Sequence, residues 1–346
     1  MRRLVPLLAR STPAFVDDLQ RAWDDGDAVL PVDPRLPPPA ADALVAAMRV
    51  DEPIDDGDAL VIATSGTTGD PKGAVLTHDA VRASALATSA RLGVDPTTDR
   101  WLSVLPLAHV GGLGVVTRAL ATGTPLTFSA DDPAATLVSM VATQVRRTDV
   151  ARFRWVVVGG AAPPAGLPAN TVTTYGMTET GSGVVYDGIP LDGVDVRSVD
   201  GQLDVRGPML LRTYRDGTDP KDADGWLRTG DAGDVVDGRV LVHGRIGDVI
   251  VTGGEKVWPD PVEAVLRDVP GVADVAIAGA PDPEWGDRVV AFIVAGDSTP
   301  TLDALRDAVK AVLPAYAAPK ELVLVDVLPR TALGKVQRSL LVSPRP

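Results

Sequence analysis

The feature that most constrains the fold is a ten-residue segment, Thr64 to Gly73, set between two apolar runs. The run before it, residues 59–63, and the run after it, residues 74–76, are short and continuous, as buried strands are. The segment between them contains three glycines, four hydroxyl side chains and one lysine. This pattern predicts a strand–loop–strand unit whose loop can approach anionic oxygen atoms closely.

The residues of this loop are suited to holding phosphate groups. Glycines let backbone N–H groups point at phosphate oxygens, hydroxyls donate further hydrogen bonds, and a lysine adds a positive charge. The segment is not a Walker P-loop, because Pro71 stands before Lys72 where that motif has glycine, and Gly73 follows it where that motif has Ser or Thr. The residues that we expect to bind phosphate are Thr64, Ser65, Gly66, Thr67, Thr68, Gly69 and Lys72.

Length and composition exclude several classes of protein. A chain of 346 residues exceeds the usual range of a single core, so two unequal domains are expected. A formal net charge of −13 disfavours nucleic-acid partners. With no cysteine and only three histidines, disulfides, thiolate catalysis and a zinc cluster are not expected. No stretch is apolar enough to span a membrane, and a cytoplasmic location is the expectation.

Local patterns predict several elements. Residues 79–92 suit a helix that ends at Gly93, and residues 155–158 suit a buried strand. Asp237-Gly238 between apolar runs predicts a two-residue hairpin turn.

The chain changes character after Gly244, where short strands alternate with two helices in a small α+β unit. One helix is expected to have Asp260 as its cap and Pro261 as its first residue. The other is expected to place four apolar residues on one face: Leu302, Leu305, Val309 and Val312.

Five further segments follow the loop: Pro106–Gly112, Tyr175–Glu179, Trp226–Asp231, Gly244–Asp248 and Pro329–Lys335. In this order, the six segments resemble the signature motifs of the adenylate-forming superfamily, which includes acyl-CoA synthetases, adenylation domains and firefly luciferase. The resemblance covers about residues 59 to 340. It implies an α/β and α+β protein with a large N-terminal domain of β-sheets packed with helices, residues 1–246, and a small mobile C-terminal α+β domain, residues 247–346. Residues 1–58 would be a shortened N-terminal region.

The resemblance implies an ATP site. Tyr175 would offer an aromatic face to adenine, Thr178 a hydroxyl to the α-phosphate, and Glu179 a hard oxygen ligand to Mg²⁺. Gly160 is expected in the same nucleotide pocket. Asp231 is placed by the resemblance on the ribose hydroxyls, although an Asp beside a turn is commonly only a cap.

Arg245 would support the same sugar. Lys335 is the expected catalytic cation of adenylation, because it would stabilise charge that gathers on the substrate carboxylate and the α-phosphate. In the superfamily the small domain then rotates and presents the Gly253-Gly254 face to the pantetheine arm of coenzyme A. This chain departs from the pattern at Gly247, where relatives usually have Asp or Lys, and its loop after Gly160 is shorter.

Another set of residues is expected to bind the acyl substrate. His109 is a candidate gate between acyl pocket and thiol tunnel, and is counted with the catalytic and substrate-binding residues. Arg118, with the hydroxyls of Thr180 and Ser182, could bind an acidic substrate group. Residues 186–194 resemble the short actinobacterial o-succinylbenzoate–CoA ligases of menaquinone biosynthesis, whose substrate carries a second carboxylate.

Other interpretations remain open. They are a general aryl- or acyl-CoA ligase, an adenylation enzyme that loads a carrier protein, and a non-catalytic nucleotide-binding relative. The last is disfavoured by the presence of Lys72, Glu179, Asp231 and Lys335. The expected ligands are ATP, Mg²⁺, coenzyme A and a small carboxylic acid, and a homodimer is an assembly that the resemblance allows.

Overall fold

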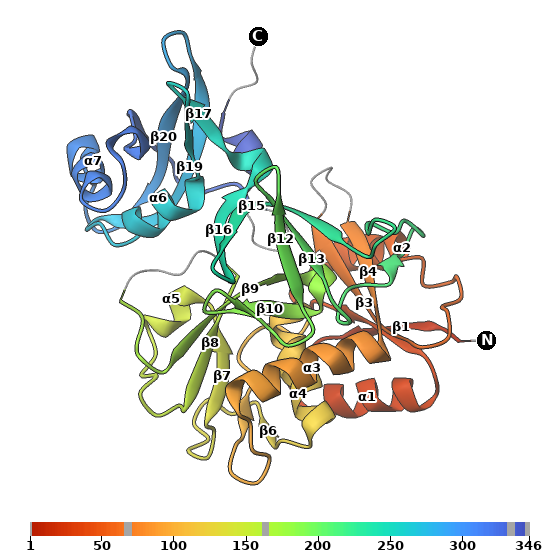
Figure 1. The fold of residues 1–346 in the computed structure, drawn as a ribbon. Helices are drawn as coiled ribbons and strands as arrows, with labels where there is room; N and C mark the ends of the chain where they lie inside the picture. The colour runs from red at the N-terminus through yellow and green to blue at the C-terminus, as the bar shows by residue number, and fades with distance from the viewer. Residues whose placement is uncertain (1, 66–70, 161–165, 331–335, 343–346) are drawn as a thin grey trace. The chain divides into compact units, whose positions relative to one another are not determined.

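The computed structural model describes residues 2–65, 71–160, 166–330 and 336–342, which form two units (Figure 1). The first unit comprises Met1–Arg197, Asp204–Arg228 and Val235–Val240. The second comprises Ser198–Leu203, Thr229–Asp234 and Leu241–Pro346. The expected division between residues 246 and 247 stays a prediction.

The first sheet of the first unit has the strand order β1-β2-β3-β4-β14. Its strands are β1 (Leu4–Leu8), β2 (Ala28–Val32), β3 (Asp58–Ser65), β4 (Pro71–Thr77) and β14 (Thr213–Tyr214). Strands β1, β2 and β3 are parallel, whereas β4 pairs antiparallel with both β3 and β14. The predicted strand–loop–strand unit is therefore the β3–β4 hairpin.

The second sheet has the order β11-β10-β9-β8-β7-β5-β6. Its strands are β5 (Trp101–Leu102), β6 (Leu126–Thr127), β7 (Leu137–Met140), β8 (Trp155–Val158), β9 (Thr171–Met177), β10 (Ser182–Tyr186) and β11 (Ile189–Pro190). Strands β5 to β9 pair in parallel, and the β9–β10–β11 edge is antiparallel. The strand predicted at residues 155–158 is confirmed as β8.

Within its described residues, the first unit has the helices α1 (Pro13–Asp24), α2 (Pro38–Ala47), α3 (His78–Leu92), α4 (Val110–Thr122) and α5 (Ala142–Val145). Helices α3 and α4 pack against each other; α3 contacts strands of both sheets, and α4 contacts the second sheet (Figure 1). The helix predicted over residues 79–92 is confirmed as α3, which begins one residue earlier, at His78. It is capped by the Thr77 hydroxyl and ends at Gly93, whose φ is 58°.

A third sheet has the order β12-β13-β15-β16. Its strands are β12 (Asp195–Val199), β13 (Gln202–Arg206), β15 (Leu227–Val236) and β16 (Arg239–Arg245). The predicted hairpin turn joins β15 to β16. Its two central residues, Asp237 and Gly238, have φ values of 50° and 76°, as a mirror-image turn requires.

The α+β part of the second unit contains a sheet of order β18-β17-β20-β19, with β21 paired to β20. The strands are β17 (Ile250–Thr252), β18 (Glu255–Val257), β19 (Val272–Asp282), β20 (Gly286–Ala295) and β21 (Glu321–Leu324), and the helices are α6 (Pro259–Leu266) and α7 (Leu302–Lys310). Short 3₁₀ turns are η1 (Thr178–Thr180), in the first unit, and η2 (Ile246–Asp248), η3 (Ala315–Ala317) and η4 (Arg338–Leu340), in the second.

Two predictions for these helices were wrong in detail. Helix α6 begins at Pro259, with Trp258 at the cap position, because the chain has a second proline two residues before Pro261 and turns there. Helix α7 ends at Lys310, so Val312 lies beyond it and is 67% exposed.

No helix in the described part of the chain combines the length and apolar character that a membrane span requires.

The apolar face of α7 gives a direct stability prediction. Leu305 is fully buried in the core of the second unit, so Leu305→Ala should lower the free energy of unfolding by about 2–5 kcal/mol. Val312→Ala, the matched control, should change it by less than about 0.5 kcal/mol. Urea unfolding followed by circular dichroism measures both; equal losses in the two variants would contradict the observed end of the apolar face.

Candidate active site

The ends of the β3–β4 hairpin hold the predicted phosphate loop. Thr64 pairs with Lys72 and Ser65 with Pro71, so the loop joins directly adjacent strands. Gly73 has no room for a side chain, because a Cβ atom there would lie 2.7 Å from Met48 Sδ and 2.8 Å from Val61 Cγ1. The four expected loop residues Gly66, Thr67, Thr68 and Gly69 lie outside the described residues.

A cluster of three side chains lies beside this hairpin. The Tyr214 hydroxyl donates a 2.9 Å hydrogen bond to Glu179 Oε1, and the Lys72 Nζ lies 5.1 Å from the centroid of the Tyr214 ring. Tyr214 is paired with Ala74, two residues from Lys72, so both side chains lie on the same face of the sheet. The sequence had suggested Lys72 and Glu179, but Tyr214 was missed because no local motif marks it.

The remaining predicted nucleotide residues of the first unit lie at the ends of β8 and β9. Tyr175 lies in β9, opposite Val185 of β10, and Thr178 begins the 3₁₀ turn η1 that also carries Glu179. Gly160 follows β8 with a φ of 90°, a conformation that favours glycine.

Thr180 occupies a different environment from the one predicted. Its side chain is 1% exposed, and its hydroxyl oxygen accepts a hydrogen bond from the Met177 N–H and lies 2.9 Å from the Met177 carbonyl and 2.7 Å from the Ser182 carbonyl. These backbone contacts close the turn η1. The geometry therefore favours a structural role for Thr180, and its substrate role stays a prediction.

Arg118, on α4, is a deeply buried cation of the first unit and is only 3% exposed. Its Nη2 donates to Ser182 Oγ at 2.5 Å and its Nη1 to Ser139 Oγ at 3.4 Å. The guanidinium lies 5.6 Å from the Trp101 ring centroid. No carboxylate among the described residues pairs with it, and its Nε has no hydrogen-bond partner there. A buried cation without a counter-ion is costly, and a bound anion would offset that cost.

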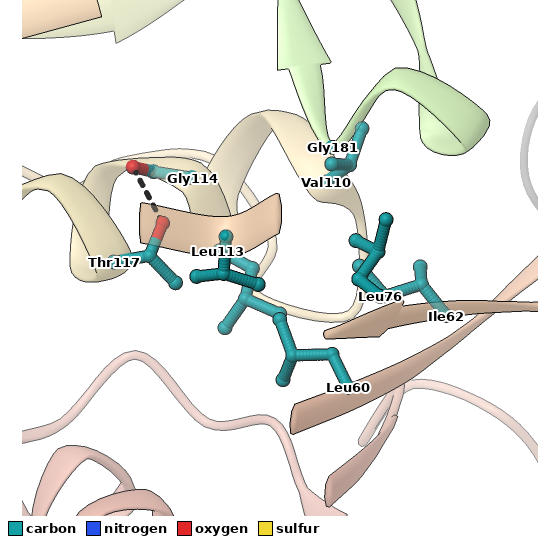
Figure 2. A pocket seen from close by; sticks show the side chains of 9 residues that line it. Leu60, Ile62, Leu76, Val110, Leu113, Gly114, Thr117 and Gly181 are labelled. Carbon is teal, nitrogen blue, oxygen red and sulfur yellow. Dashed lines mark hydrogen bonds between the residues drawn. The ribbon is translucent and has the colours of Figure 1, made fainter. Parts of the chain in front are cut away.

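A small apolar cavity borders α4 (Figure 2). Gly114 lines it, and a Cβ atom on Gly114 would lie 3.4 Å from Arg118 Nη2. Its volume is about 10 Å³, which is room for a single water molecule at most. Strands β3 and β4 and helix α4 supply most of its wall, and Thr117 donates a hydrogen bond to the Gly114 carbonyl there (Figure 2). The cavity is too small to hold an acyl group, so it is a packing gap among β3, β4 and α4.

His109 precedes α4 at its cap position and is half-buried. Burial lowers the pKa of its imidazole; the charge of Asp33 opposes this shift and that of Arg35 adds to it. The Arg35 guanidinium, which donates to Asp33 Oδ2 at 2.5 Å, lowers the pKa of Asp33; burial opposes this shift, and the charge of His109 adds to it. The sequence missed Asp33 and Arg35, which lie in a proline-rich stretch without a motif.

In the second unit, the expected ribose residues are brought together. Arg245 Nε lies 3.0 Å from Asp231 Oδ1, and Arg245 Nη1 donates to the Thr229 carbonyl at 2.7 Å. This pairing orients the Asp231 carboxylate.

The Gly253-Gly254 turn packs on an aromatic ring in the second unit. Gly253 N–H donates to the Trp285 carbonyl at 2.8 Å, and a Cβ atom on Gly253 would lie 2.8 Å from the Trp285 ring. Lys320 Nζ lies 3.5 Å from the centroid of that ring. Gly247, in η2, has open space around it, and Lys335 lies outside the described residues.

Among the described residues, no group of three or more His, Cys, Asp or Glu side chains could enclose a metal ion. A single carboxylate such as that of Glu179 is enough for a metal whose other ligands are phosphate groups and water, as for Mg²⁺ bound to ATP.

Comparisons with known proteins identify the family of the chain. A family model described as AMP-binding enzyme matches residues 14–215, and one described as AMP-binding enzyme C-terminal domain matches residues 261–335. A probable 2-succinylbenzoate–CoA ligase of Mycobacterium tuberculosis is 39% identical over 99% of this chain and 98% of its own length. The 2-succinylbenzoate–CoA ligase of Listeria monocytogenes is 31% identical over 82% of this chain and 69% of its own.

The fold is also similar to a solved structure. The o-succinylbenzoate CoA synthetase (MenE) of Bacillus subtilis, in complex with the acyl-adenylate intermediate OSB-AMP, superimposes with a TM-score of 0.77. It is 27% identical in sequence, and the match covers 99% of this chain and 83% of that one.

The environment of His109 generates a prediction. Burial lowers the pKa of His109 and the charge of Asp33 opposes that shift, so Asp33→Asn should lower the pKa further. As a control, Asp79→Asn should lower the pKa of His78, because the charge of Asp79 raises that pKa. The same substitution should leave the pKa of His109 unchanged. NMR titration of the three imidazoles measures both. If Asp33→Asn left the His109 titration unchanged, Asp33 would not act on this imidazole.

Proposed function

Because this chain belongs to the AMP-binding enzyme family, we propose that it uses ATP to convert a carboxylic acid into its acyl-AMP and then transfers the acyl group to coenzyme A. The acid that we propose is 2-succinylbenzoate, after the names of the two ligases reported above.

The observation that carries the choice of acid is the Arg118 guanidinium. The substrate has two carboxylates, of which one is activated and the other needs a cation inside the protein. Arg118 offers a buried cation with hydrogen bonds to the Ser182 and Ser139 hydroxyls and no carboxylate partner among the described residues. A bound carboxylate would supply the missing counter-charge.

For the adenylation half-reaction we assign a role to each motif residue. The β3–β4 loop with Lys72 would bind the phosphates, Tyr175 the adenine and Thr178 the α-phosphate. Asp231 would accept hydrogen bonds from the ribose hydroxyls, held in place by Arg245. Lys335 would stabilise the charge that develops as the substrate carboxylate attacks the α-phosphate and pyrophosphate leaves.

Glu179 is the side chain that we assign to Mg²⁺. When bound, the ion would neutralise charge on the ATP phosphates. Glu179 is half-buried, and its Oε1 accepts the Tyr214 hydrogen bond, so Oε2 is the oxygen that we assign to the metal.

For thioester formation we propose that residues 247–346 move as one domain and bring the Gly253-Gly254 turn to the pantetheine arm. His109, whose pKa is lowered by burial, would stand uncharged at the path of the thiol. A homodimer and a cytoplasmic location stay predictions.

The role of Lys335 predicts a separation of the two half-reactions. Lys335→Ala should abolish acid-dependent pyrophosphate release, because the developing charge loses its cation, and should spare coenzyme A acylation from supplied acyl-AMP. Lys310→Ala, which removes an exposed lysine of α7, should leave both rates unchanged. Equal loss of both half-reactions in Lys335→Ala would refute this division of labour.

The choice of acid is tested by pyrophosphate release with 2-succinylbenzoate, benzoate and a medium-chain fatty acid, each with and without coenzyme A. The wild-type chain should prefer 2-succinylbenzoate. Arg118→Met should lower kcat/KM for this acid about ten- to a hundredfold, because a hydrogen bond to a charged group contributes about 1.5–3 kcal/mol. Benzoate, which lacks the second carboxylate, is the control and should be turned over equally by both proteins.

The outcomes separate the alternatives. Wild-type preference for another acid would keep the ligase chemistry and favour a general aryl- or acyl-CoA ligase. Adenylate formation without acyl transfer to coenzyme A would favour a carrier-loading enzyme. No turnover of any acid would favour a non-catalytic relative.

A further inference from the structure

We propose that Tyr214 is a positioning residue that holds both the metal ligand and the phosphate-binding lysine of the ATP site. Its hydroxyl would fix the Glu179 carboxylate, and its ring would fix the Lys72 ammonium. The inference rests on the proposed function, because it takes Glu179 as the ligand of Mg²⁺ and Lys72 as a ligand of the phosphates.

The backbone places Tyr214 at the hairpin that carries the phosphate loop. Strand β14 has only two residues and pairs with the middle of β4, so that Tyr214 is opposite Ala74. The Arg215 N–H donates to the Gly73 carbonyl at 2.7 Å and extends this pairing toward Lys72. The ring of Tyr214 is thereby brought diagonally across from the Lys72 side chain.

Two arginines flank this short strand and hold it. The Arg212 guanidinium binds the buried Asp58 carboxylate at 2.9 and 3.0 Å. The Arg215 guanidinium donates to four backbone carbonyls, those of Met48, Arg49, Glu52 and Pro53. A two-residue strand has few ladder bonds of its own, so these side chains make Tyr214 a well-fixed support.

The hydroxyl of Tyr214 acts on Glu179. A phenol that donates to a carboxylate forms a charge-assisted hydrogen bond, and the 2.9 Å contact engages Oε1. The carboxylate is then oriented with Oε2 for the metal. Groups that orient a metal ligand in this way typically contribute ten- to a hundredfold in metal affinity.

The ring of Tyr214 acts on Lys72. An ammonium 5.1 Å from the ring centroid is attracted to the negative face of the ring. No ion pair joins Lys72 to Glu179 in the described part of the chain. Such a pair would neutralise both charges and would have to break before phosphate and metal could bind. Tyr214 instead holds the cation and the anion while it keeps them apart.

The test separates the two functions of the side chain by calorimetric titration with ATP in the absence of acid. Tyr214→Phe keeps the ring and loses the hydroxyl, so the Kd for ATP with Mg²⁺ should rise about tenfold, while the Kd for ATP with EDTA should not change. Tyr214→Leu loses both parts, so both Kd values should rise. Tyr316→Phe is the matched control, since Tyr316 is an exposed tyrosine of the second unit, and should match the wild type in both titrations.

Glu179→Gln distinguishes this inference from the proposed function. If Mg²⁺ lowered the Kd for ATP, relative to EDTA, as much in Glu179→Gln as in the wild type, the metal role of Glu179 would be refuted. If Mg²⁺ no longer lowered the Kd for ATP in Glu179→Gln but still did so in Tyr214→Phe, the metal role of Glu179 would be supported and the Tyr214 inference would be overturned. An equal rise of both Kd values in Tyr214→Phe would also overturn it, because it would indicate a general structural defect.

Discussion

The antiparallel pairing of β3 with β4 is the contact on which the site of the first unit depends. Burial of the apolar residues in both strands fixes the pairing, and the pairing brings Thr64 and Lys72 to the same end of the hairpin. Strand β14 then adds to β4 and carries Tyr214 to the side of Lys72. Apolar packing thus determines where the polar ends of the strands lie, and the polar side chains at those ends form the candidate site.

The second constraint is the burial of a cation on α4. Placing a guanidinium inside a protein has a large desolvation cost, which hydroxyls and an aromatic face offset only in part. Arg118 has these partners in Ser182, Ser139 and Trp101, from three strands of the second sheet. The same arrangement that raises the free energy of the unliganded protein would, under the proposed function, favour an acid with a second carboxylate. One side chain would then affect both stability and substrate choice.

Part of the candidate site could be predicted from the sequence, because its residues stand in motifs with a clear chemical reason. Asp231 and Arg245 were expected at the same sugar, and Arg245 Nε lies 3.0 Å from Asp231 Oδ1. Their role toward ATP stays a prediction. Tyr214 could not be predicted, because a two-residue strand has no periodicity and its partner Glu179 is 35 residues away. The start of α6 was wrong because two prolines, both suited to the first turn of a helix, stand two residues apart.

The sequence by itself determined the residue types and the local conformations: the helix that ends at Gly93, the Asp237-Gly238 turn and a loop rich in donors. These depend on interactions over a few residues, which the order of side chains specifies directly. Only the tertiary structure decided which distant groups meet, such as Arg118 with Ser182 across 64 residues. Such contacts follow from strand register and helix packing, where many weak apolar contacts act together and no single residue carries the signal.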